Sequence, residues 1–185
     1  GSAFGLAAAQ GVMDGLHQMG RGFAVHAARI PLVPSAIIFD LLNGGQKNWT
    51  TNPYPALGHQ ALENASRQFA LGTVGAGTGA QTAMHKGGLG SASVEIDDGI
   101  MVGALVIANP LGSVTTPSGR HFWAAPFEMK SEFGALGPEP EHGYQIPPPS
   151  RKAAAMAELG NTTIAIVATA AAKTKACIKT PIAIA

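Results

Sequence analysis

A chain of 185 residues, 46% of them apolar and 12% charged, is long and apolar enough to bury the core of a single domain, which excludes an intrinsically disordered protein. The formal net charge is +1 and no run of Lys or Arg occurs, so neither nucleic acid nor an anionic membrane is indicated as a partner. The one cysteine, Cys177, cannot form an internal disulfide, and these residues hold no signal peptide or bilayer-spanning run, so we expect a cytoplasmic protein.

The first predicted element is a helix that follows a glycine-rich lead-in, GSAFG, and ends at GRGF. Its apolar residues recur at three- and four-residue steps, which is typical of the buried face of an amphipathic helix. They are Leu6, Ala9, Met13, Leu16 and Met19. Residues 33–39 then form an apolar run followed by an Asn-Gly-Gly turn at 43–45, which predicts a buried strand.

The remaining predicted elements alternate between helices and strands. In chain order they are a helix over 56–70, a glycine-rich segment at 72–93, a strand at 101–109, a proline-rich irregular connection at 117–150, a short helix at 150–160, a strand at 162–170 and the start of a helix at 173–185. This order predicts one layered α/β or α+β domain over residues 1–185.

The glycine-rich segment contains GAGTGA, from Gly75 to Ala80, which formally fits a dinucleotide-binding fingerprint, with Glu95 at the distance of a ribose-binding acid. That fingerprint should leave a strand and open a helix, and the flanking residues suit neither element. Glycines at this density more often allow close backbone approach or frame a pocket. We therefore expect no nucleotide cofactor.

The histidines show no spacing typical of metal ligands. They are His17, His26, His59, His85, His121 and His142. We expect no metal.

The stretch ELGNTTIAIVATAA, residues 158–171, places two threonines between a Gly-Asn pair and an apolar run. A threonine hydroxyl is a weak nucleophile that its own free α-amine, with a pKa of roughly 7.7–8.0, can activate as a base. This chemistry requires cleavage before Thr162, and Gly160 and Asn161 tolerate backbone conformations that strain that bond. Taken alone, the stretch favours a simpler interpretation, in which two β-favouring residues begin a strand.

Six motifs in order carry a resemblance to a known family: GSAFGL, VPSAIIFDLLNG, GTVGAGTGA, KGGLGSAS, VGALVIANPLG and GNTTIAIVATAA. Over nearly the whole chain they resemble the self-processing N-terminal-nucleophile hydrolases. These include the L-aminopeptidase/D-amidase/esterase, the β-peptidyl aminopeptidases and the nylon-oligomer (6-aminohexanoate-oligomer) hydrolases. The resemblance implies an αββα-type sandwich, a precursor that cuts itself into α and β chains, and amide hydrolysis by the newly exposed Ser or Thr.

The resemblance also implies roles for single residues. It implies self-cleavage between Asn161 and Thr162 into fragments 1–161 and 162–185, with Thr162 as the nucleophile. Asn109, at the end of its apolar strand, matches the family's oxyanion-stabilising asparagine, and a side-chain amide is a suitable donor there. The other candidates are Lys86, in the KGG motif, as a catalytic lysine of the nylon-oligomer type, and Ser2, Gly75, Gly77 and Gly79 as pocket residues.

The resulting hypothesis is an amide or peptide hydrolase that acts on short peptides or oligomeric amides, with its own α and β fragments as partners in a homo-oligomer. One alternative is an acyltransferase similar to the ornithine acetyltransferases, which also cut themselves before a threonine. Another is a non-catalytic scaffold that keeps the fold. The family's first strands and its downstream acidic residues have no match here, so we expect the polypeptide to continue past both ends, in preference to a degraded homologue.

Overall fold

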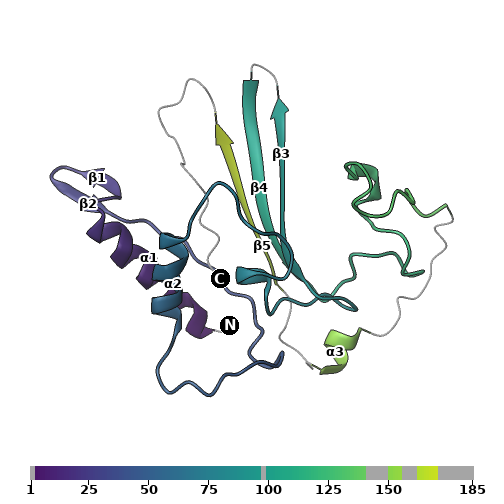
Figure 1. Ribbon diagram of the computed structural model, residues 1–185, viewed down its shortest axis with the longest axis horizontal. Helices are drawn as coiled ribbons and strands as arrows, with labels where there is room; N and C mark the ends of the chain where they lie inside the picture. Colours follow the sequence, from purple (N-terminus) through teal and green to yellow (C-terminus); the bar gives the residue numbers. More distant parts are fainter. Residues whose placement is uncertain (1–2, 97–98, 141–149, 156–161, 171–185) are drawn as a thin grey trace.

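A three-stranded antiparallel sheet forms the centre of the molecule in a computed structural model that describes residues 3–96, 99–140, 150–155 and 162–170 (Figure 1). Its strands, in spatial order, are β3 (Gly88–Ile96), β4 (Ile100–Asn109) and β5 (Thr162–Ala170). Apolar residues dominate β4 and β5, as expected for strands that bury one face. β4 is the middle strand, so both of its edges are hydrogen-bonded.

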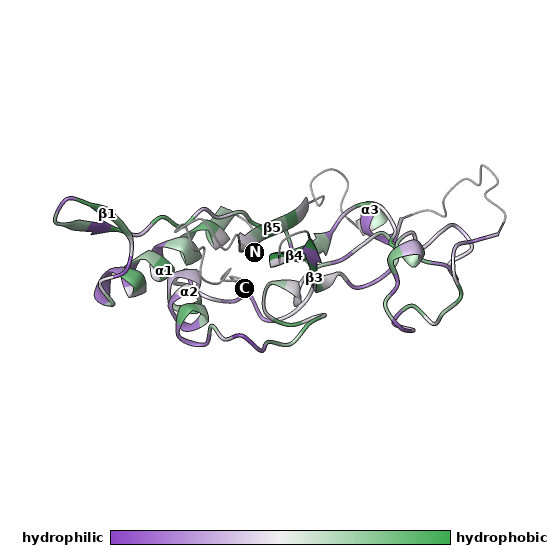
Figure 2. Ribbon diagram, turned by 90° about the horizontal axis from the view of Figure 1, so that it is seen from above, coloured by the Kyte–Doolittle hydropathy of each residue, from purple (hydrophilic) through white to green (hydrophobic). Residues whose placement is uncertain are grey.

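Two helices, α1 (Ala7–Gln18) and α2 (Tyr54–Glu63), pack against each other on one side of the sheet (Figures 1 and 2). A Cβ atom on Gly11 would lie 1.8 Å from the main-chain oxygen of Pro55, and one on Gly58 would lie 2.0 Å from that of Ala8. No side chain fits at either glycine, so the two helix backbones are in direct contact. A short 3-10 helix, Ala3–Leu6, precedes α1.

The core cluster lies on the inner face of the sheet and is completed by loop residues. Leu105 and Ile107 are buried on this face of β4, because every second side chain of a strand points to the same side. Leu89 of β3 and Ile164 of β5 are the direct partners of Ile107 and extend the same apolar surface, which Ile38 covers. The chain therefore has a mixed α/β architecture around a small sheet.

The other elements lie outside this core. They are the hairpin of β1 (Phe23–Val25) and β2 (Ala28–Ile30), the 3-10 turn Ala125–Phe127 and the short helix α3 (Arg151–Ala155). The 3-10 turn Gly75–Gly77 instead packs against the core through Ala76. In the predicted connection at 117–150, the described residues up to 140 form that 3-10 turn, other turns and bends, and one isolated bridge, as expected. No helix in the described ranges is both long and apolar enough to cross a bilayer.

Three predicted elements are confirmed as α1, β4 and β5. The predicted buried face of α1 is correct only in part, because Ala9 is buried and Met13 and Leu16 are partly buried, but its two end residues are exposed. Leu6 and Met19 are 48% and 50% exposed. The buried residues of α1 are Ala8, Ala9, Gly11, Val12 and Gly15. Small residues face α2 because the two backbones touch, and this close packing leaves the larger side chains at the rim.

The strand predicted at 33–39 is also wrong, because these residues are irregular. Pro31 and Pro34 lack the N–H groups that a strand needs for its ladder. Ile38 is nevertheless buried, so the apolar run reflects burial and not strand pairing.

The second predicted helix, over 56–70, is α2, which begins at Tyr54 and ends at Glu63. The Asn52 side chain accepts a hydrogen bond from the Tyr54 N–H at its start, at 3.0 Å. Most of β3 lies in the glycine-rich segment. The sequence did not predict this strand, because its glycine and serine residues have low strand propensity. The short helix predicted at 150–160 begins as α3, whereas the helix start predicted at 173–185 lies outside the described residues.

Candidate active site

The pairing of β4 with β5 brings Asn109 and Thr162 together. They are Cα partners at one end of the antiparallel ladder. Directly opposed residues of such a pair point to the same face of the sheet, with Cβ atoms about 4.5–5.5 Å apart. Asn109 shares the inner face with Leu105 and Ile107, so Thr162 also projects towards that face.

The two adjacent threonines have different surroundings. Side chains alternate along β5, and the described burial follows that alternation at the start of the strand. Thr162 and Ile164 are partly buried on the inner face, whereas Thr163 and Ala165 are exposed on the outer face. Of the two hydroxyl groups, the one on Thr162 is therefore the one beside Asn109.

The Asn109 side chain is held in one orientation. Its Oδ1 accepts hydrogen bonds from the Gln81 N–H at 2.9 Å and from Lys152 Nζ at 3.0 Å. A main-chain N–H and an ammonium group can only donate, so the atom that faces them is the amide oxygen. The amide nitrogen, Nδ2, is buried and has no hydrogen-bond partner among the residues the structure describes, although Asn109 is 0% exposed.

Lys152 of α3 provides the second hydrogen bond to this amide. It is 2% exposed, and its Nζ also contacts three main-chain oxygens, at 2.6 Å from Asn109, 2.9 Å from Gln81 and 3.4 Å from Pro110. All four contacts are acceptors, which fits a charged ammonium group. Burial lowers the pKa of Lys152 below its ordinary value of 10.5.

Lys152 was not a candidate from the sequence, because it lies in an alanine-rich stretch that indicated only a short helix. α3 is anchored beside the site at its start: the Lys152 N–H donates to the Ala83 oxygen at 3.4 Å, and the hydroxyl of Ser150, the residue before the helix, donates to the same oxygen at 3.5 Å. The one available signal was a lysine shortly before the predicted cleavage site. Nothing in its spacing indicated that it would reach Asn109.

Lys86, the lysine predicted from the KGG motif, lies at the edge of the same region. It is exposed, and in the described part of the chain its side chain makes no hydrogen bond or ion pair. Its backbone forms an isolated bridge with Gln81, which closes a turn held by the Thr82 N–H donating to the His85 oxygen at 2.9 Å. This turn places the Gln81 N–H against the Asn109 side chain. The lysine that contacts Asn109 is Lys152 and not Lys86.

The predicted pocket glycines have separate surroundings. Gly75 lines an apolar cavity, whereas a Cβ atom on Gly77 would lie 2.4 Å from the Gly72 oxygen, and one on Gly79 would lie 2.0 Å from Asp40 Oδ2. Gly77 and Gly79 thus allow the segment to pass close to its neighbours. The motif GAGTGA opens a 3-10 turn and no α-helix. Two further predicted residues, Ser2 and Asn161, lie outside the described residues.

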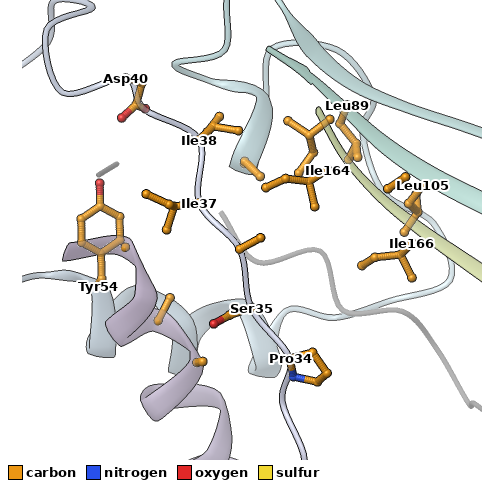
Figure 3. Close-up of a pocket in the computed structure, with 18 residues that line it drawn as sticks. Pro34, Ser35, Ile37, Ile38, Asp40, Tyr54, Leu89, Leu105, Ile164 and Ile166 are labelled. Carbon is orange, nitrogen blue, oxygen red and sulfur yellow. The ribbon is translucent and has the colours of Figure 1, made fainter. Parts of the chain in front are cut away.

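An apolar cavity of about 320 Å³ lies on the inner face of the sheet (Figure 3). Its sheet side consists of Leu89, Leu105, Ile107, Ile164 and Ile166. Asp40 and Tyr54 lie at its other side, and burial raises the pKa of Tyr54. Thr162 and Asn109 do not line this cavity, but each is two residues from a residue that does, about 7 Å along its strand.

The described residues contain no group of three or more His, Cys, Asp or Glu side chains that could hold a metal ion. The groups that the structure brings together at this site are the Thr162 hydroxyl, the Asn109 amide, whose Nδ2 has no partner among the described residues, and the buried Lys152 ammonium. A nucleophile next to a fixed donor is the arrangement needed to form and stabilise a tetrahedral intermediate at a carbonyl carbon.

Comparison with known proteins gives matches over almost the whole chain. Residues 1–180 match the sequence model of peptidase family S58. An uncharacterized aminopeptidase of Mycobacterium tuberculosis is 39% identical over 179 residues, which cover 97% of this chain and 51% of the relative. An uncharacterized aminopeptidase of Mycobacterium leprae is 38% identical over 174 residues, which cover 91% of this chain and 46% of the relative. The chain thus spans about half the length of the curated relatives it matches.

Proposed function

Because the chain belongs to peptidase family S58, we propose that it is part of an amide and peptide hydrolase that cuts itself before Thr162 and then uses Thr162 as its nucleophile. The observation that carries this proposal is the direct pairing of Thr162 with Asn109 on the inner face of the sheet. The aminopeptidase names of the mycobacterial relatives support a hydrolase that acts on peptides.

The proposed self-cleavage starts from the intact chain. The Thr162 hydroxyl oxygen attacks the carbonyl carbon of Asn161, the C–N bond between Asn161 and Thr162 breaks, and the hydroxyl proton passes to the released Thr162 nitrogen. Water then hydrolyses the resulting ester. The developing oxyanion accepts a hydrogen bond from Asn109 Nδ2, the buried donor that has no partner among the described residues. The products are fragments 1–161 and one beginning at Thr162, which now carries a free α-amine.

The proposed hydrolysis repeats this chemistry on a bound amide. The α-amine of Thr162 accepts the hydroxyl proton, since a pKa of roughly 7.7–8.0 leaves a useful fraction unprotonated near neutral pH. The hydroxyl oxygen attacks the substrate carbonyl, and the protonated amine then gives the proton to the leaving amine. Water releases the acid from the acyl-enzyme and restores Thr162.

The apolar cavity supports a substrate with an aliphatic segment next to the scissile amide. Leu105, Ile107 and Ile164 provide its apolar wall on the same face as the proposed nucleophile. Short peptides with apolar side chains and nylon-type oligomers both have this character, and we propose them as the substrate class. An αββα-type sandwich in the full-length protein would cover this cavity on its open side.

The experiment that tests the proposal uses the protein expressed from the full reading frame that contains this chain. Its intact mass should reveal two fragments, the second beginning with Thr162, and the processed protein should release p-nitroaniline from amino-acid p-nitroanilides. A single uncut chain without activity would support the non-catalytic scaffold instead. Product analysis with an added amine separates hydrolysis from acyl transfer, because an acyltransferase would give mainly the amide of that amine.

A further inference from the structure

The Asn109 amide has two rigid anchors on its oxygen side. One is the Gln81 N–H at 2.9 Å, which the turn at 81–86 fixes in place. The other is Lys152 Nζ at 3.0 Å, which is also held by the main-chain oxygens of Asn109 and Gln81 at 2.6 Å and 2.9 Å. Both anchors are hydrogen-bond donors. If the amide rotated by half a turn, its NH₂ group would face these donors and neither hydrogen bond could form.

We propose that Lys152 is a positioning residue that fixes the Asn109 amide with its oxygen turned inward, so that both Nδ2 hydrogens stay available to the oxyanion. This inference rests on the proposed function, because it gives Lys152 a role only if Asn109 stabilises the oxyanion. Lys152 itself touches neither the substrate nor the reacting atoms in this scheme. It acts through Asn109.

The charge of Lys152 adds to this effect. In the part of the chain that the structure describes, no carboxylate pairs with its ammonium group, and its partners are an amide oxygen and main-chain carbonyls. A positive charge on the oxygen side of an amide polarises the group and strengthens its N–H donors. Lys152 therefore favours the geometry and also the donor strength that an oxyanion requires.

A purely packing role would predict a different set of consequences. A lysine that only filled space would be costly to bury, since desolvation disfavours its charge and a methionine of similar length would fit without that cost. The four acceptors that surround Nζ would also be unnecessary. The arrangement is therefore explained by the orientation of Asn109 and not by packing alone.

The test is a double-mutant cycle in the full-length protein, with kcat and KM normalised to the processed fraction. Lys152→Met should lower kcat about 10²-fold with KM nearly unchanged, the loss expected from displacing a catalytic group by about 1 Å. Arg151→Met is the matched control, because Arg151 is the exposed neighbour on α3, and it should keep the parent kcat. Lys152→Arg, which keeps charge and donors, should recover at least about tenfold over Lys152→Met.

The decisive comparison uses Asn109→Ala as the second mutation. If Lys152 acts through Asn109, Lys152→Met should cause no further loss of kcat in the Asn109→Ala background. Losses that multiply, or a Lys152→Met variant with the parent kcat, would overturn the inference. Should Lys152→Met be recovered only as unfolded protein, the same cycle is run with Lys152→Gln, which is neutral and polar. Undiminished activity of Thr162→Ala would instead overturn the proposed function itself.

Discussion

Thr162 faces Asn109 across the end of the β4–β5 ladder, while its neighbour Thr163 is exposed on the opposite face of the sheet. Two threonines that are equivalent in the sequence are thus distinguished by the alternation of a strand. Replacing each threonine in turn by alanine therefore tests which of the two hydroxyl groups is the nucleophile.

Thr162→Ala should leave the full-length protein as one uncut chain, whereas Thr163→Ala should be cut at the wild-type site. Thr162→Ser should still be cut, because a serine hydroxyl can perform the same attack. Intact mass and N-terminal sequencing of the second fragment measure these outcomes. Complete processing of Thr162→Ala would rule out Thr162 as the nucleophile of self-cleavage.

Asn109→Ala should lower kcat by about 10²–10³-fold with little change in KM, because it removes a donor that acts mainly on the developing oxyanion. The variant should also process slowly, since self-cleavage forms a similar intermediate, so its rate is divided by the processed fraction. Asn109→Asp is a more specific test, because aspartate can still accept hydrogen bonds from Gln81 and Lys152 but has no side-chain N–H group to donate. A processed Asn109→Asp enzyme with wild-type kcat would contradict the oxyanion role.

The pH dependence of stability should reveal the burial of Lys152. Its pKa is lowered from 10.5 on folding, so between the lowered pKa and 10.5 the unfolded chain binds more protons than the folded one. The free energy of unfolding should therefore rise with pH across that window, relative to a Lys152→Met variant that lacks this titration. Urea unfolding of both proteins in the uncut Thr162→Ala background measures the difference, and a gap that stays constant with pH would contradict the lowered pKa.

Gly58→Ala should destabilise the protein although alanine favours helices by about 1 kcal/mol over glycine. The new Cβ atom would lie 2.0 Å from the Ala8 oxygen of α1, so the helices must separate, at a cost of about 1–3 kcal/mol. Gly103→Ala on β4 is the control, because no atom lies within 4 Å of its Cβ position. Equal unfolding free energies for the two variants would show that the α1–α2 contact is looser than described.

The sequence predicted those parts of the fold that depend on one dominant local pattern. The apolar runs at 101–109 and 162–170 predict strands, and α1 has clear helical spacing, although β5 is less buried than its apolar sequence predicts. β3 and the strand wrongly predicted at 33–39 show the limit of this reasoning. The glycine and serine residues of β3 have low strand propensity, and β3 forms because it pairs with β4. The apolar run at 33–39 lies beside prolines and is irregular, although part of it is buried.

The candidate site shows the same limit. The family resemblance pointed to Thr162 and Asn109, and the strand register then placed them opposite each other. The role of Lys86 stays a prediction: Lys86 is exposed, and the lysine in contact with Asn109 is Lys152, from a helix far along the chain. Only the turn at 81–86 and the anchoring of α3 on Ala83 bring these residues together. Such long-range contacts leave no periodic trace in a sequence.

The β4–β5 ladder has a further consequence for what maturation would produce. Its paired positions run from Met101 with Ala170 to Asn109 with Thr162, and every pair except this last one involves residues beyond the peptide bond that precedes Thr162. Cutting that bond would convert a strand pair within one chain into an interface between two subunits, held by the antiparallel pairing of the central strand β4 with the outer strand β5. The α and β fragments should therefore co-elute at any dilution and part only when the sheet unfolds. Two genes divided at this point should reconstitute the enzyme by strand complementation.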